Sequence, residues 1–173
     1  PNAILCSGFS KTVAPGIRIG WVHSVNYMRK IASLKYTSTM GTSVLSQAAV
    51  AELLRSGGYD AHLRKLRREL ARQISEMRQS VLREFPAGTT VSDPEGGYVL
   101  WVAMPPQALN VRELFLKARN AGIGIAPGHI FATDQRYDHC FRLNAGFGWN
   151  AEVEQAIRQL AQWCQLSLTD AQA

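Results

Sequence analysis

The chain has 173 residues, of which 46% are hydrophobic and 18% are charged, and its formal net charge is +6. This balance is typical of a globular protein with one ordinary core, and it excludes an intrinsically disordered chain. No apolar run reaches the length of a membrane-spanning helix, so we expect no membrane partner. The first residues show no basic region followed by an apolar stretch, which predicts that no signal peptide is present.

The cysteines and histidines indicate a reducing environment. Cys6, Cys140 and Cys164 are widely spaced and odd in number, which fits neither a disulfide framework nor a metal-binding pattern. The four histidines do not cluster with cysteines or acids at ligand spacing. We therefore predict a cytoplasmic protein without a metal site.

The N-terminal part is predicted to hold two strands and two helices. Residues 3–6 and 17–22 have the apolar composition of short buried strands, and residues 27–36 carry apolar side chains at steps of three, as in a helix. Residues 37–43 form a hydroxyl-rich segment that we expect to be a loop. A second helix is predicted over residues 46–54, before a pair of glycines.

A long amphipathic helix is predicted from Asp60, its expected cap, to residue 85. Apolar residues recur along it at steps of three or four: Leu63, Leu66, Leu70, Ile74, Met77, Val81 and Phe85. Residues 64–72 give it a basic outer face. Such a run is usually a solvated face, while nucleic-acid binding is the alternative. Aromatic residues do not alternate with the arginines as they do on single-strand-binding surfaces.

The remainder of the chain is rich in predicted strands. The expected elements are strands at 89–92 and 97–104, a helix at 111–121, strands at 123–126 and 140–144, and a helix at 151–166. This order predicts an open α/β (α+β) lobe, in which helices pack on one face of a mainly antiparallel sheet.

The segment around Lys11 is the strongest candidate for chemistry. Lys11 follows a short apolar strand, and Arg18 lies seven residues later, past a Pro-Gly pair. A lysine that forms a Schiff base must be held rigidly and kept partly deprotonated, and a fixed cation nearby helps with both. The planar guanidinium of Arg18 is also suited to bind a phosphate. The spacing alone is more typical of two strands joined by a loop with a solvated lysine.

This segment, Ser-Gly-Phe-Ser-Lys followed by Pro-Gly-Ile-Arg-Ile-Gly-Trp, resembles the lysine segment of class I and II aminotransferases. It is particularly similar to MocR-type regulators, in which a GntR-family winged helix is fused to an aminotransferase-like domain. Residues 59–68 (Tyr-Asp-Ala-His-Leu-Arg-Lys-Leu-Arg-Arg) resemble the start of the connector helix in such regulators. The rest of the chain follows the family order, so the resemblance covers nearly its whole length.

The resemblance implies the C-terminal half of a pyridoxal-phosphate (PLP)-dependent transferase fold of type I. Residues 1–45 would be the end of the large PLP-binding domain, residues 46–88 the connecting helices, and residues 89–173 the small domain. The chain lacks an initiator methionine and resembles a fragment of a longer protein.

The resemblance also implies PLP as the cofactor and assigns roles to residues. Lys11 would be the catalytic residue that forms the Schiff base and then moves a proton. Arg18 matches the arginine that binds the cofactor phosphate, and Ser10 and Ser7 add hydroxyl groups nearby. Relatives usually carry Ser or Thr at the position of Gly8, which implies weaker phosphate binding here.

Three later segments are similar to the family's substrate-binding segments. Arg142, in the sequence Arg-Leu-Asn, matches the arginine that binds the substrate α-carboxylate. Without the resemblance, a lone strand arginine is more often a salt-bridge partner. Gly97 and Tyr98 belong to a segment that borders the substrate pocket in relatives, as do residues 127–131. Taken alone, both are equally typical of plain turns next to strands.

These features favour the effector domain of a GntR/MocR-type transcription regulator, which senses an amino acid or amine through an aldimine. DNA would then be bound only by a domain outside this chain. The alternative is an aminotransferase for an aromatic or long-chain amino acid, and whether turnover occurs stays open. A third hypothesis is direct nucleic-acid binding by the basic helix.

Other cofactor-binding residues of fold relatives lie upstream of the lysine strand. These are an aspartate on the pyridinium nitrogen, a tyrosine, an asparagine and a stacked aromatic residue. We therefore expect the 173-residue chain alone to be inactive and to hold PLP weakly. The family is dimeric, which implies a homodimer.

Overall fold

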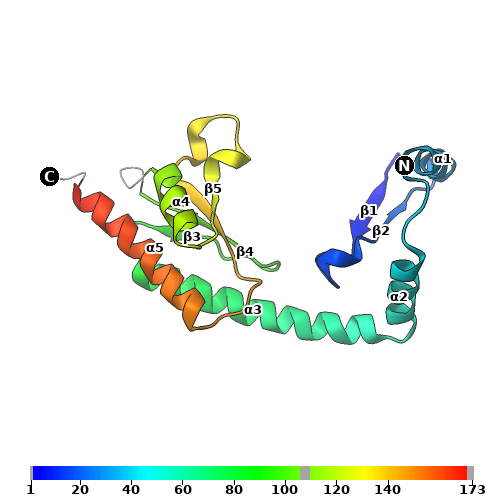
Figure 1. Cartoon of the computed structure of the whole chain (residues 1–173), viewed down its shortest axis with the longest axis horizontal. Helices are drawn as coiled ribbons and strands as arrows, with labels where there is room; N and C mark the ends of the chain where they lie inside the picture. The colour runs from blue at the N-terminus through cyan, green and yellow to red at the C-terminus, as the bar shows by residue number, and fades with distance from the viewer. Residues whose placement is uncertain (1, 106–109, 171–173) are drawn as a thin grey trace. The chain divides into compact units, whose positions relative to one another are not determined.

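The computed structural model describes residues 2–105 and 110–170. The chain forms two compact units, Pro1–Lys65 and Leu66–Ala173 (Figure 1). The boundary between them falls inside one long helix, α3 (Gly58–Glu84). The expected division into the end of the large domain (1–45), the connecting helices (46–88) and the small domain (89–173) stays a prediction.

The first unit contains a hairpin and two helices besides the start of α3. Its elements are β1 (Leu5–Gly8), β2 (Gly20–His23), α1 (Met28–Thr39) and α2 (Val44–Arg55). The two strands pair antiparallel, with Ser7 opposite Trp21 and Gly8 opposite Gly20. Figure 1 shows this hairpin in blue, with α1 and α2 in blue-green to cyan.

The predicted strands of this unit were partly wrong. All residues of β1 are exposed, so the strand is not buried, and it lies two residues later than expected. The second strand begins at Gly20 because Pro15–Ile17 forms a 3₁₀-helix and Arg18 takes a left-handed backbone. Proline favours the first turn of a helix, which explains the helical start of this segment.

The predicted loop at residues 37–43 was wrong for its first three residues, which complete α1. The hydroxyl of Thr37 donates to the carbonyl oxygens of Ser33 and Leu34, at 3.2 and 3.1 Å. Hydroxyl side chains that bond back along a helix in this way are compatible with its last turn. Asp60 is not the cap of α3, since the helix begins at Gly58, and its carboxylate lies in the first turn instead.

The core of the first unit is small. Its buried hydrophobic residues are Phe9, Ile19 and Val50, with Val13, Ile17 and Tyr59 packed against them. Many large apolar side chains remain exposed: Ile4, Leu5, Trp21, Val25, Tyr27, Met28, Leu34, Tyr36, Met40, Val44, Leu45 and Leu54. This unit therefore buries little of its own apolar surface.

The second unit is a four-stranded antiparallel sheet with helices on one face. Its elements are β3 (Thr90–Val91), β4 (Val99–Ala103), α4 (Val111–Asn120), β5 (Ala126–Pro127), β6 (Cys140–Asn144) and α5 (Ala151–Asp170). The strand order is β3-β4-β6-β5, and each neighbouring pair is antiparallel. The predicted fold class, mixed helix and mainly antiparallel sheet, is confirmed.

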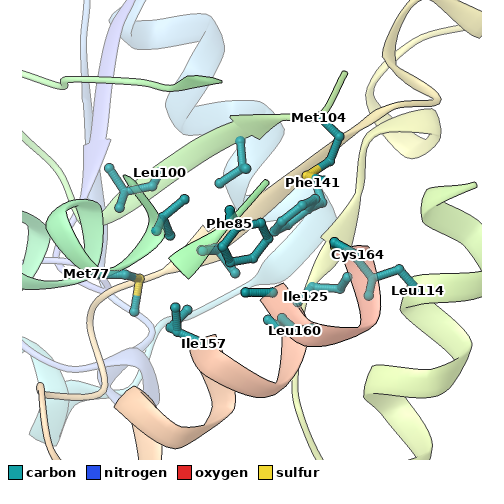
Figure 2. Packing of buried hydrophobic residues seen from close by; sticks show 14 of the residues in the cluster. Met77, Phe85, Leu100, Met104, Leu114, Ile125, Phe141, Ile157, Leu160 and Cys164 are labelled. Atoms are coloured by element: carbon teal, nitrogen blue, oxygen red, sulfur yellow. The ribbon is translucent and has the colours of Figure 1, made fainter. Parts of the chain in front are cut away.

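Alternation along the strands gives this sheet two different faces. Leu100 and Val102 of β4 and Phe141 and Leu143 of β6 are buried and belong to one hydrophobic core. That core is completed by side chains of α3, α4 and α5, including Met77, Leu114, Ile157, Leu160 and Cys164 (Figure 2). The intervening residues of both strands project to the opposite face.

The apolar stripe predicted along α3 is buried from Ile74 onward, while Leu63, Leu66 and Leu70 are only half-buried. The basic side chains expected on its outer face are exposed: Arg64, Lys65, Arg67, Arg68 and Arg72. Of the helices that the structure describes, none combines the length and apolar character needed to cross a membrane.

Candidate functional site

Lys11 is the exposed residue of a turn, residues 9–13, between β1 and the 3₁₀-helix. The turn is closed by the carbonyl oxygen of Phe9, which accepts from the amides of Thr12 (3.3 Å) and Val13 (2.8 Å). The amide of Phe9 donates to Ile19 at 2.9 Å, and the Phe9 ring is buried. An anchored phenylalanine therefore fixes the backbone that presents the lysine to solvent.

The structure brings Ser10 and Arg18 together beside this turn. Nη1 of Arg18 donates to the Ser10 hydroxyl at 3.3 Å. Arg18 has φ 49° and ψ 36°, and this left-handed backbone follows the 3₁₀-helix directly. Within residues 2–105 and 110–170, no carboxylate forms an ion pair with Arg18. A guanidinium and a hydroxyl without a competing carboxylate suit the binding of a phosphate.

Two glycines of the hairpin differ in how much space surrounds them. A Cβ atom at Gly20 would lie 2.8 Å from the carbonyl oxygen of Ser7, so a side chain there would separate the strands. A Cβ atom at Gly8 would meet only the Ile19 carbonyl oxygen, at an ordinary 3.6 Å. The space at Gly8 therefore accepts the hydroxyl residue usual in relatives. Ser7 lies on β1 next to Gly8 and is exposed.

The first turns of α3 hold the lysine turn, a role that the sequence analysis did not assign. The Tyr59 hydroxyl donates to Oγ1 of Thr12 at 3.1 Å, and Nε2 of His62 lies 2.7 Å from the Thr12 carbonyl oxygen, to which it donates. The Tyr59 ring also meets Phe9 edge-on, with centroids 5.8 Å apart. The sequence feature that could have indicated this role is a tyrosine and a histidine three residues apart, which lie on one face of a helix.

Arg142 projects from β6 on the face of the sheet away from the hydrophobic core, and it is exposed. Its guanidinium lies over the Phe131 ring, 5.0 Å from the centroid. Among the residues that the structure describes, no carboxylate pairs with Arg142. The usual salt-bridge role of a strand arginine is thus not observed there, and its N–H groups are available to a carboxylate ligand.

Gly97 and Tyr98 precede β4 in the same unit as Arg142. Gly97 has φ 87°, a conformation that favours glycine. The Tyr98 carbonyl oxygen accepts from the amide of Ala145 at 2.8 Å, which ties this loop to the end of β6. A cavity of about 690 Å³ between α3 and residues 93–97 borders Gly97, but its lining does not include Arg142.

The cysteines of the second unit do not offer a nucleophile. Cys140 and Cys164 are buried and free, whereas Cys6 of the first unit is exposed. Burial raises the pKa of the Cys140 thiol and raises that of Cys164 to about 12. Because the thiolate is the reactive form, both buried thiols are inert near neutral pH.

Comparison with known proteins shows the family to which the chain belongs. A family model described as aminotransferase class I and II matches residues 1–160. The Escherichia coli (strain K12) protein described as the uncharacterized HTH-type transcriptional regulator YdcR is 41% identical over 160 residues, which cover 92% of this chain and 34% of that protein. The chain thus spans about a third of that relative's length.

Solved structures extend the likeness to the fold. Pyrococcus horikoshii kynurenine aminotransferase is 26% identical with a TM-score of 0.84, over 94% of this chain and 40% of that one. LysN, an α-aminoadipate aminotransferase of Thermus thermophilus complexed with N-(5'-phosphopyridoxyl)-L-leucine, is 25% identical with a TM-score of 0.86, over 98% and 43%. The fold is therefore that of PLP-dependent aminotransferases. The chain belongs to the class I and II aminotransferase family, which implies PLP as its cofactor.

Proposed function

We propose that this chain is the C-terminal part of a PLP-binding effector domain in a GntR/MocR-type transcription regulator. The ligand is an amino acid or amine, the assembly is a cytoplasmic homodimer, and DNA is bound by a separate upstream domain. The likeness to the regulator YdcR supports this choice over a metabolic aminotransferase.

The observation that carries the proposal is the pairing of Ser10 with Arg18 beside the turn of Lys11. A cofactor with an aldehyde and a phosphate needs an amine for the first group and an anion-binding pair for the second. The chain supplies both within the nine residues 10–18, and Ser7 adds a further hydroxyl on the adjoining strand. The donor set therefore fits PLP.

Each proposed site residue has a distinct task. Lys11 attaches the cofactor and holds or moves a proton at Nζ, while Ser10 and Arg18 bind the phosphate. Arg142 binds the ligand carboxylate through two parallel N–H groups and so orients the ligand. Gly97 and Tyr98 border the ligand. Bound PLP would supply an electron-withdrawing ring that stabilises negative charge at the carbon next to the ligand amine.

Borohydride trapping of PLP on the full-length protein tests the proposal. We expect peptide mass spectrometry to find the reduced cofactor on Lys11, and Lys11→Ala to abolish the adduct. Arg18→Met should lower PLP affinity by roughly tenfold or more, since it removes charge-assisted hydrogen bonds to the phosphate.

Lys30→Ala, a change at another lysine of the first unit, is the matched control and should leave the adduct unchanged. Equal labelling of Lys11 and the other lysines would refute the assignment. The 173-residue chain by itself is expected to trap PLP poorly. Gel-shift assays with the full-length protein, with and without amino acids, then separate a ligand-responsive regulator from an enzyme that only turns them over.

A further inference from the structure

We propose that Phe131 is a positioning residue that holds the guanidinium of Arg142 in the orientation needed to bind a ligand carboxylate. The inference rests on the proposed function, in which Arg142 binds that carboxylate. Phe131 ends the segment 127–131, which resembles a pocket-bordering segment of the family, but the sequence assigned no individual role to this side chain. It is carried by an aromatic cluster on the face of the sheet opposite the hydrophobic core.

The cluster comes from three segments of the second unit. Trp101 of β4 lies directly opposite Arg142 in the strand register. The Phe131 ring meets Trp101 nearly edge-on, with centroids 5.4 Å apart and planes at 73°. Tyr137 meets Trp101 in the same way, at 5.2 Å and 77°. Phe131 is therefore fixed against a second ring while its own ring lies under the guanidinium of Arg142.

A glycine sets the position of Phe131. Phe131 ends the 3₁₀-helix η2 (Gly128–Phe131), which follows β5. A Cβ atom on Gly128 would overlap the carbonyl oxygen of Tyr137 and lie 2.6 Å from that of Cys140, the first residue of β6. Only glycine thus lets η2 rest directly on the backbone of the strand that carries Arg142. Tyr137 belongs to η3 (Gln135–Tyr137), whose start is capped by Asp134.

This arrangement has a physical consequence for binding. An exposed arginine samples many rotamers, and ordering it when a ligand binds costs free energy. A ring against the flat face of the guanidinium restricts those rotamers, yet leaves the N–H groups at its edge free for a bidentate carboxylate contact. Within the described residues, no side chain or carboxylate occupies those groups by a hydrogen bond or ion pair. Phe131 therefore acts through Arg142 and not on the ligand itself.

The test compares two probes on the full-length protein. One is N-(5'-phosphopyridoxyl)-L-leucine, and the other is the phosphopyridoxyl derivative of 3-methylbutylamine, which is the same molecule without the carboxylate. The measured quantity is the affinity for the leucine derivative divided by the affinity for the amine derivative. We expect Phe131→Leu to lower this ratio roughly threefold to tenfold, because Arg142 would then lose more rotamer freedom when the carboxylate binds. Phe131→Tyr should retain the ratio, because its ring is preserved.

Leu116→Ala is the matched control, since Leu116 is an exposed apolar residue of α4, in the same unit but outside the segments assigned to ligand binding, and it should leave the ratio unchanged. In an Arg142→Met background, Phe131→Leu should have no further effect on the ratio. Equal weakening of both probes by Phe131→Leu would mean a merely structural role and would overturn the inference. If Arg142→Met lowers the ratio and Phe131→Leu does not, the inference alone fails. If Arg142→Met leaves the ratio unchanged, the carboxylate role of Arg142 fails as well.

Discussion

Gly8 lies three residues before Lys11, where family relatives usually carry a hydroxyl residue. The hairpin does not require this glycine, because a Cβ atom there meets only one carbonyl oxygen at 3.6 Å. Gly20 on the opposite strand is required, since its Cβ atom would approach Ser7 to 2.8 Å. The sequence predicted roles for the lysine, serine and arginine through their motif, but it could not show that the two glycines differ in the space around them. Their difference depends on the distance between two paired strands.

Gly8→Ser is expected to strengthen PLP binding to the full-length protein by roughly tenfold, through one added hydrogen bond to the phosphate. Fluorescence titration with PLP measures the change. Gly16→Ser is the matched control, because a Cβ atom at Gly16 would meet nothing within 4 Å, and it should leave the affinity unaltered. A weaker or equal affinity for Gly8→Ser would show that the phosphate does not lie near this position.

At the scale of elements, two helices were predicted to within two residues at each end: 46–54 for α2 (Val44–Arg55) and 111–121 for α4 (Val111–Asn120). Their N-caps were not predicted: Ser43 caps α2 by accepting from the amide of Ser46, and Asn110 caps α4 by accepting from that of Arg112. The 3₁₀-helices were not predicted, since three or four residues carry no apolar periodicity. The contact of Phe131 with Arg142 was also missed. This contact joins η2 to β6, and a local sequence pattern cannot predict a contact between residues of two separate elements.

The first turns of α3 are expected to restrain the lysine turn. Tyr59→Phe removes the hydroxyl that donates to Thr12, and losing one such bond weakens the turn by about 0.5–1.5 kcal/mol. Hydrogen exchange at the amides of Thr12 and Val13 should therefore become faster. Tyr36→Phe, at an exposed tyrosine of α1, is the control. Unchanged exchange in Tyr59→Phe would mean that the backbone bonds to Phe9 suffice.

At the scale of the whole molecule, the two units differ in how much apolar surface they bury. The second unit has a continuous core from a sheet and three helices. The buried hydrophobic core of the first consists of Phe9, Ile19 and Val50. Since burial of apolar surface is the main stabilising contribution to folding, the first unit gains far less from its own contacts. This difference could not be read from the even apolar composition of the chain.

Limited proteolysis of the 173-residue chain is expected to cut the first unit early and to leave a resistant fragment that begins near residue 66. Local opening needs the least free energy where few apolar contacts are broken. Mass spectrometry of the time course locates the cuts. In the full-length protein, the same sites should be protected if upstream residues cover the exposed apolar side chains. Equal lifetimes of both units in the short chain would contradict the expectation.

At Arg18, the residue that would suit the backbone best differs from the residue that the proposed phosphate contact needs. A left-handed conformation costs roughly 1–2 kcal/mol for an ordinary side chain, and glycine or asparagine adopts it more readily. Directed evolution for heat resistance alone would thus be drawn toward Arg18→Gly or Arg18→Asn. Those variants would be more stable to heat but would lack the cation that we propose binds the cofactor phosphate. A screen for more heat-stable variants of this protein should therefore keep Arg18 unchanged.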